Sequence, residues 1–199
     1  MWTFAGQVLV LLASFALNKV LSGRLDVDSF GEYNLIKRSV TVISLMLAGA
    51  GIAMPRYLAI YLGKGDNARA KAFVRAAIWF VATVTVVVGV AATIFKPKLY
   101  AIVTGRDDIL LYIVAFVYAA MLTASTMIYV YFRGKNDFKR FNISNALLQL
   151  LLPASALIIP GINTLNIFVW WTIITAVVTL IFVIGEYLKG GLQCSERIT

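Results

Sequence analysis

The chain has 199 residues, of which 61% are hydrophobic, and its 18 basic and 9 acidic residues give it a net charge of +9. Soluble domains contain roughly 45–50% apolar residues, so this composition excludes an ordinary soluble globular domain. The sequence has no histidine and one cysteine, which excludes a Ser-His-Asp triad, a Cys-His pair, an HExxH zinc site and an intrachain disulfide. We therefore expect an integral membrane protein that moves a substrate and is not an enzyme, with no cofactor and no metal.

Long uncharged stretches recur along the chain, and each is close to the roughly 20 apolar residues that a helix needs to cross ~30 Å of hydrocarbon. The stretches are continuous and not alternating, which favours helices over strands. The longest, residues 141–185, is about twice one span and is divided by Pro160 and Gly161. The sequence thus predicts an all-α integral membrane protein built as a six-helix transmembrane bundle. The predicted spans are residues 3–21, 36–61, 75–95, 109–132, 141–160 and 164–186.

The basic residues are divided unevenly between the two sides of this bundle. Seven fall in the first and third connections, and eleven fall around the second and fourth connections and in the C-terminal tail. The positive-inside rule places the more basic side in the cytoplasm. We predict a six-span lobe over residues 1–188 and a short cytoplasmic tail over 189–199, with both termini on the cytoplasmic side of an inner membrane. We expect the cations to contact anionic phospholipids, and we expect no nucleic-acid partner.

Polar groups within the spans are neutral. All nine acidic residues are expected in connections or at span edges, so the carboxylates that transporters use for proton or sodium coupling are not expected within a span. Amides align instead: Gln7 and Asn18 share one face of the first span with Ser14, and Asn145 and Gln149 share one face of the fifth. Such faces either bind sugar or headgroup hydroxyls in a cavity, or hydrogen-bond between helices.

Two arginines bracket the second predicted span. Arg38 and Arg56 are separated by about 27 Å along a helix at 1.5 Å per residue. Each either marks a membrane border or turns inward as a guanidinium that binds phosphate oxygens. Arg24, in the first connection, is open to the same two interpretations.

Several short motifs follow one another in the order of a known family. They are Asn18 to Arg24, Phe30-Gly31-Glu32-Tyr33, the glycine-rich stretch Gly49 to Ala59, and the basic stretch Lys64 to Lys71. In this order, and over roughly residues 5–185, the chain resembles the N-terminal half of polysaccharide (O-antigen-type) flippases. These flippases belong to the multidrug/oligosaccharidyl-lipid/polysaccharide exporter superfamily.

The resemblance implies a fold and a function. Members have two lobes of about six or seven helices around a central cavity, and they move undecaprenyl-pyrophosphate-linked oligosaccharide across the inner membrane by alternating access for polysaccharide biosynthesis. The chain resembles one lobe, so we expect a truncated transporter with a lipid-linked oligosaccharide as substrate and a second lobe or a second copy as partner. The candidate substrate-binding residues are Arg38 and Arg56, then Arg24, together with Asn18, Asn145 and Gln149.

Two other functions stay open. A non-transporting membrane component or remnant of a polysaccharide assembly system would keep its glycan phenotype when Arg38 and Arg56 are replaced by alanine. A multidrug or metabolite exporter of the same superfamily would show cation-coupled efflux and would need an acidic residue within the membrane.

Overall fold

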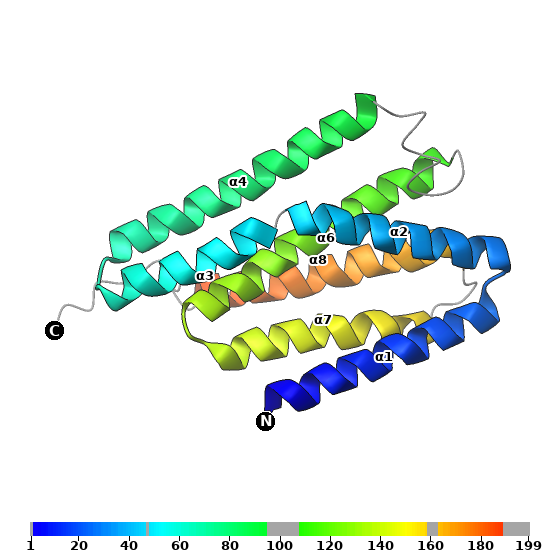
Figure 1. The fold of residues 1–199 in the computed structure, drawn as a ribbon, viewed down its shortest axis with the longest axis horizontal. Helices are drawn as coiled ribbons and strands as arrows, with labels where there is room; N and C mark the ends of the chain where they lie inside the picture. Colours follow the sequence, from blue (N-terminus) through cyan, green and yellow to red (C-terminus); the bar gives the residue numbers. More distant parts are fainter. Residues whose placement is uncertain (1, 47, 95–107, 159–162, 189–199) are drawn as a thin grey trace.

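The described part of the chain folds into long helices that lie side by side (Figure 1). The computed structural model describes residues 2–46, 48–94, 108–158 and 163–188, and no strand occurs in these ranges. The helices are α1 (Trp2–Arg24), α2 (Val27–Met46), α3 (Ala48–Gly63), α4 (Asn67–Ile94), α6 (Ile109–Gly134), α7 (Phe138–Ile158) and α8 (Thr164–Leu188).

Asp and Asn side chains cap the starts of α2, α4, α6, α7 and α8, which explains why several acidic residues lie in connections. A side-chain oxygen at the N-cap accepts a hydrogen bond from one of the otherwise unpaired backbone N–H groups of the first turn. Asp108 accepts from the N–H groups of Leu110 and Leu111 at 2.9 and 3.2 Å, and Asp66 accepts from that of Arg69 at 3.0 Å. Side chains that do the same for α2, α7 and α8 are Asp26, Asp137 and Asn163.

The prediction of an all-helical chain is confirmed for the described residues, but the count of six spans is not. Among the described residues, three helices are long and apolar enough to cross a membrane, over Asn67–Ala91 in α4, Ile109–Gly134 in α6 and Thr164–Glu186 in α8. The division between a lobe over residues 1–188 and a tail stays a prediction, because residues 189–199 lie outside the described part of the chain.

The second predicted span and the connection before it differ most from the helices. The second predicted span, residues 36–61, is shared by α2 and α3, which follow one another in nearly the same direction (Figure 1). The predicted connection between the first two spans is mostly helical, because α1 continues to Arg24 and Asp26 caps α2 directly afterwards. Glu32 therefore lies in a helix and is buried, although the sequence analysis placed it in a connection.

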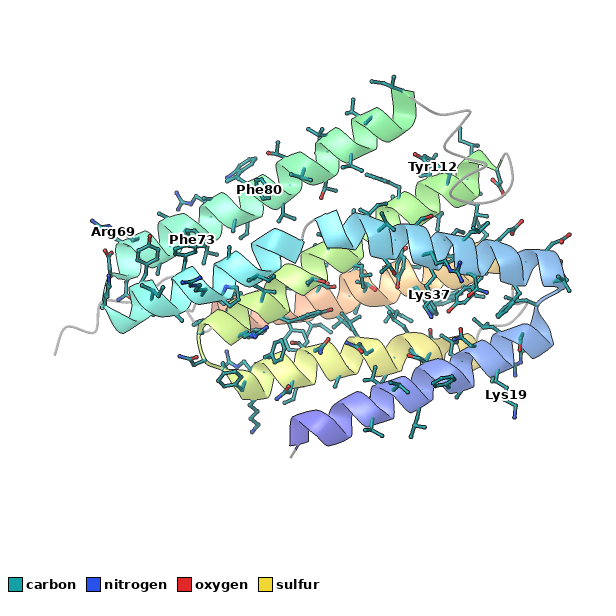
Figure 2. All side chains as sticks on the ribbon, viewed as in Figure 1. Lys19, Lys37, Arg69, Phe73, Phe80 and Tyr112 are labelled. Carbon is teal, nitrogen blue, oxygen red and sulfur yellow. The ribbon has the colours of Figure 1, made fainter. Side chains whose placement is uncertain are left out.

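The helix α6 is the centre of the bundle, in contact with α2, α3, α4, α7 and α8. The helix α4 packs mainly on α3 and lies along the outer edge (Figure 1). The α3–α4 and α6–α7 connections lie at the end of the bundle where α1 begins and α8 ends. Figure 2 shows Arg69 at this end and Lys19 toward the opposite end.

Two separate cores hold these helices together. The first joins α1, α2, α6, α7 and α8. In it the rings of Phe168 and Trp171 contact each other and the rings of both Tyr33 and Tyr118, with ring centres 5.5–5.9 Å apart. The second joins α3, α4 and α6.

In the second core α3 crosses α6 closely at Gly134, where an added Cβ would lie 2.7 Å from the Leu58 side chain and 3.1 Å from the Pro55 backbone. Only glycine permits this approach without displacement of α3.

Candidate functional site

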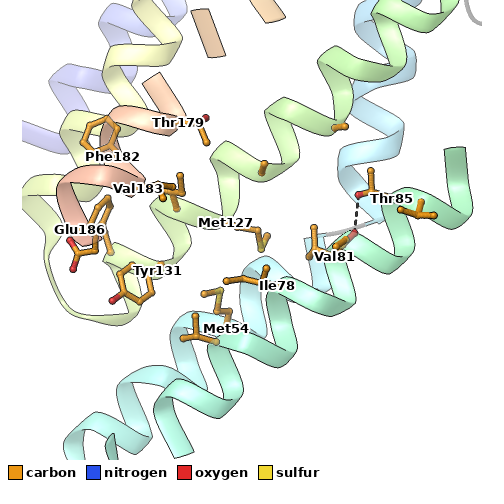
Figure 3. A pocket seen from close by; sticks show the side chains of 17 residues that line it. Met54, Ile78, Val81, Thr85, Met127, Tyr131, Thr179, Phe182, Val183 and Glu186 are labelled. Atoms are coloured by element: carbon orange, nitrogen blue, oxygen red, sulfur yellow. Dashed lines mark hydrogen bonds between the residues drawn. The ribbon is translucent and has the colours of Figure 1, made fainter. Parts of the chain in front are cut away.

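An apolar cavity of about 510 Å³ lies between α4, α6 and α8, with Met54 of α3 at one side (Figure 3). Four of its seventeen lining residues have hydroxyl or carboxyl side chains: Thr85, Tyr131, Thr179 and Glu186. The Thr85 hydroxyl donates a hydrogen bond to the Val81 carbonyl of its own helix at 2.8 Å. A cavity with these walls suits an apolar chain better than a sugar, which would need several polar partners.

The helix α4 packs on its neighbours along one side and leaves the cavity open beside it. Ala70, Val74 and Val81 are buried in the second core. Near the far end of α4, Gly89 approaches α6 so closely that an added Cβ would lie 2.9 Å from the ring of Phe116. On the cavity side, α6 presents the small side chains of Ala120 and Ala124. Small residues on one wall leave space that no side chain of α4 fills.

A cluster of charged side chains lies at one end of the cavity, which Glu186 lines. Glu186 of α8 has a side chain that is only 7% exposed, and its two oxygens accept hydrogen bonds from Lys135 at 2.7 Å and Arg140 at 2.8 Å. Arg140 also bonds Asp137 at 3.1 Å. Burial lowers the pKa of Lys135, but its hydrogen bonds to Glu186 and Tyr131 outweigh this effect, so the pKa is raised above its ordinary value. Lys135 therefore keeps its charge at neutral pH.

A second groove, of about 280 Å³, continues from the cavity toward the same end of the bundle. It lies between α3, α4 and the end of α6, and it shares Val74, Ile78 and Tyr131 with the cavity. Its basic lining residues are Lys71, Arg75 and Lys135. The apolar cavity thus leads into a groove that is edged by cations.

The two ends of the bundle differ in charge. The charged residues around the α3–α4 and α6–α7 connections and the end of α8 are mostly basic. Around the α1–α2 connection and the start of α6, the described basic and acidic residues are equal in number. The first set contains Lys64, Arg69, Lys71, Arg75, Arg133, Lys135, Lys139 and Arg140 with Asp66, Asp137 and Glu186. The second set contains Lys19, Arg24, Lys37 and Arg38 with Asp26, Asp28, Glu32 and Asp108.

A comparison with known protein families decides the membership of this chain. The family model MatE matches residues 3–151. The chain belongs to the MatE family. The MatE match runs from α1 into α7 and so includes the cavity walls from α3, α4 and α6, whereas Glu186 of α8 lies beyond it. No curated protein and no solved structure matches the chain significantly.

Membership of the MatE family confirms the resemblance found in the sequence. The family is part of the exporter superfamily that includes the polysaccharide flippases, and this chain fits the N-terminal half of such proteins. Its members are transporters and not enzymes. The family match and the apolar helices together make this chain a membrane exporter protein.

The six residues predicted to bind substrate are dispersed over four helices, and none of them lines the apolar cavity or the second groove. Arg24 ends α1, Arg38 lies in α2 and Arg56 in α3, and all three are exposed. Asn18 lines a shallow groove along α1 with Ser14. The amides of Asn145 and Gln149 bond one another at 2.7 Å within α7. Their role in binding substrate stays a prediction.

The residues of the charged cluster and the second groove are not predicted from the sequence. The basic residues at 133–140, which include Lys135 and Arg140, indicate the orientation of the chain but not which cations meet an acidic partner. The same is true of Lys71 and Arg75. Glu186 follows a long apolar stretch, and nothing in that stretch indicates that both of its carboxylate oxygens bond cations from other elements.

Proposed function

We propose that this MatE-family chain forms one lobe of a flippase for lipid-linked oligosaccharide, of the undecaprenyl-pyrophosphate type, in polysaccharide biosynthesis. Two-lobe transporters hold their substrate at the interface between lobes. A second lobe, or a second copy of this chain, is therefore part of the proposal.

One observation supports this substrate class above the others: an apolar cavity of about 510 Å³ continues into a groove edged by Lys71, Arg75 and Lys135. A lipid-linked oligosaccharide has a long apolar chain joined to an anionic pyrophosphate. The apolar walls suit the apolar chain of the lipid. The cations of the groove suit the pyrophosphate, because Lys and Arg bind phosphate oxygens. The order of the two environments matches the order of the two chemical groups.

A drug or metabolite exporter is the second candidate, and the cavity itself provides its support. Nearly all of the lining is apolar, and a carboxylate, Glu186, lies at one end, which is a combination that suits an organic cation. That carboxylate, however, already bonds Lys135 and Arg140. The cluster therefore offers no surplus negative charge to a cation, and we favour the anionic substrate.

The proposed location is the inner membrane, with the basic end of the bundle in the cytoplasm. The support is the concentration of Lys and Arg around the α3–α4 and α6–α7 connections, because cytoplasmic connections are enriched in these residues. Both termini would then lie in the cytoplasm. Reporter fusions to the two connections and to both ends of the chain test this orientation, and a fusion that reports the opposite side contradicts it.

The function is tested in cells that lack a lipid-linked oligosaccharide flippase. The chain is expressed with a second lobe, and surface glycan and accumulated lipid-linked oligosaccharide are measured. We expect glycan to be restored and the accumulated intermediate to fall. If the protein is present in the membrane but glycan is not restored and the intermediate does not fall, the proposal is contradicted. The chain would then be a non-transporting component.

Two alanines of α4 give a matched pair of variants for this experiment. Ala82 lines the cavity, whereas Ala76 is an exposed residue of the same helix outside the linings of the cavity and the groove. We expect Ala82→Trp to abolish glycan restoration and Ala76→Trp to leave it nearly unchanged. If Ala82→Trp instead changes only the resistance of the cells to apolar cationic drugs, the exporter alternative is correct.

A further inference from the structure

We propose that the gap between α4 and α8 is an opening through which the apolar chain of the substrate passes sideways between the bilayer and the cavity. This inference rests on the proposed function, which gives the substrate an apolar chain, and it adds the route by which that chain enters. The residues that carry it are Ile78 of α4 and Val183 of α8 at the two edges of the gap, and Met127 of α6 behind them (Figure 3).

The walls of the cavity leave one side without a helix. Both α4 and α8 contact α6, which forms the inner wall, but among the described residues α4 and α8 do not contact one another. The helix α3 contributes only Met54 to the lining. The side between α4 and α8 is therefore not covered by any described helix of this chain.

The exposure of the lining residues shows in which direction the cavity is open. At the edges of the gap, Ile78 and Val86 of α4 are 51% and 63% exposed, and Val183 of α8 is 43% exposed. At the inner wall, Met127 of α6 is 8% exposed. Exposure thus falls from the edges of the gap to the wall behind it, as expected for a space that opens sideways.

The gap lies at the depth of the hydrocarbon layer. The helices α4, α6 and α8, which provide nearly all of the lining, are long and apolar enough to cross a membrane. A gap between two such helices faces lipid chains and not water. A substrate chain that crosses it exchanges lipid neighbours for apolar side chains and exposes none of its length to water, which would be unfavourable.

The two ends of the cavity suit an apolar chain less well than its side. At the basic end, Glu186 accepts hydrogen bonds from Lys135 and Arg140, and a chain that entered there would have to pass these charged groups. Toward the opposite end, the ring of Phe116 on α6 lies so close to Gly89 of α4 that an added Cβ would be 2.9 Å from it. Entry through the gap avoids both obstacles.

The test links the two edges of the gap. The full chain with Cys194→Ser, which removes its one cysteine, is reconstituted in vesicles of phosphatidylethanolamine, and Ile78→Cys/Val183→Cys places a thiol on each edge. Because α4 and α8 both pack on α6, their axes are at most about 20 Å apart, and a series of bismaleimides up to that length can join the thiols. The matched control, Ile143→Cys/Ile181→Cys, places two thiols along a different groove, between α7 and α8.

The probe is polyprenyl pyrophosphate with a diazirine in its chain. After irradiation, mass spectrometry of peptides measures the labelling of Met127, inside the cavity, against that of Phe80, which is exposed on α4 outside the cavity lining. We expect labelling of Met127 to be lost when the edges are linked before the probe is added, and to be kept when they are linked after the probe has entered. Labelling of Phe80 should not change.

In the control pair, the order of linking should make no difference. A second pair, Ile78→Cys/Thr179→Cys, spans the same gap one turn away along α8 and should behave as the first pair does. Thermal unfolding confirms that each variant is folded.

Four outcomes overturn the inference. Labelling of Met127 that does not depend on the order of linking would mean that the chain enters by another route. No labelling of Met127 in unlinked protein would mean that the chain does not reach the cavity. Labelling by a diazirine-bearing phosphatidylglycerol alone would make the gap a place for bilayer lipid. The same order dependence in the control pair would mean that linking acts on the whole bundle.

The proposed function fails in a different experiment, so the two failures are distinguishable. Glycan that is not restored in cells, although the probe labels Met127 in an order-dependent way, contradicts the proposed function and leaves the opening between α4 and α8 in place.

Discussion

The helix α6 separates two regions that are packed in different ways. On one side, Tyr118 and Ala119 lie in the large core with α2 and α8, where Tyr33 and Phe168 are fully buried and the aromatic rings contact one another. On the other side, Ala120 and Ala124 face a cavity, and α4 beyond it exposes Trp79 and Phe80.

This difference separates a close-packed side of the lobe from a more open one. A close-packed core resists displacement, because every neighbour loses contacts when one side chain shifts. The helix α4 packs on α3 and α6 through the smaller core and approaches Phe116 at Gly89. The space between α4, α6 and α8 stays open on this side.

The largest expected effect comes from removing a ring on the rigid side. Phe168 is 0% exposed and contacts the rings of Tyr33, Tyr118 and Trp171. Phe168→Ala should lower the free energy of unfolding by about 3–5 kcal/mol, measured by denaturant titration in detergent. Phe80→Ala, at a ring on α4 that is 56% exposed, should change it by less than about 1 kcal/mol. Similar losses in both variants would contradict the division into two regions.

A second pair of variants compares the two faces of α6 directly. Ala119 is 1% exposed in the large core, and Ala124 lines the cavity. Ala119→Leu should lower the free energy of unfolding by about 1–3 kcal/mol, because the extra atoms have no space. Ala124→Leu adds the same atoms to an open space and should leave stability nearly unchanged while it weakens binding of a lipid chain. If Ala124→Leu is the more destabilising, the cavity is not available to a ligand in the folded protein.

The charged cluster at the end of the cavity gives a smaller effect that depends on pH. Glu186→Gln keeps the shape of the side chain but leaves Lys135 and Arg140 without their carboxylate, so we expect a loss of about 1–2 kcal/mol at neutral pH. The pKa of Lys135 is raised in the folded protein, and a raised lysine contributes stability that is present below its unfolded pKa and is lost as the pH rises through the folded pKa. The difference between wild type and variant should therefore shrink at strongly alkaline pH.

The control for this experiment is the same kind of change at a more exposed acid, Asp66, whose side chain is 33% exposed. Asp66→Asn removes a charge from a partner of Arg69 but keeps a side chain that can cap α4. Its effect at neutral pH should be within about 0.5 kcal/mol. If Asp66→Asn and Glu186→Gln lower the free energy of unfolding equally, burial of the Glu186 cluster does not add to stability.

Much of the fold can be predicted from local features of the sequence. Continuous apolar stretches indicate the helices α4, α6 and α8, and Pro160 with Gly161 indicates the interruption between α7 and α8. The start of α2 is not predicted although Asp26 is a signal for it, because the charged residues around it also fit a loop. An N-cap aspartate supports a helix as readily as it supports a turn, and the charge alone does not distinguish the two.

The candidate site could not be predicted in the same way, because its residues meet only through packing. Glu186 is 51 residues from Lys135 and 46 residues from Arg140, and no local pattern connects them. Conversely, the 18-residue spacing of Arg38 and Arg56 fits one helix with two border residues, and both are exposed in α2 and α3. Spacing along a helix determines which residues share a face, but the neighbouring helices determine whether that face meets a cavity.

The smallest expected effect tests whether two similar motifs act alike. The Asp66–Arg69 and Asp137–Arg140 pairs both begin a helix at the basic end, with N–O distances of 3.2 and 3.1 Å. Arg69 is 76% exposed, so Arg69→Ala should lower the free energy of unfolding by at most about 0.5 kcal/mol.

Arg140 differs from Arg69 because it also bonds the buried Glu186 and lies over the ring of Phe132. Arg140→Ala should therefore cost more than Arg69→Ala, by about 1 kcal/mol or more. Equal effects in the two variants would mean that each arginine acts only through the aspartate that precedes it, and that Glu186 is held in place by Lys135 alone. A larger effect at Arg140 would instead establish that both cations hold the end of α8 against the α6–α7 connection, at the end of the cavity that Glu186 lines.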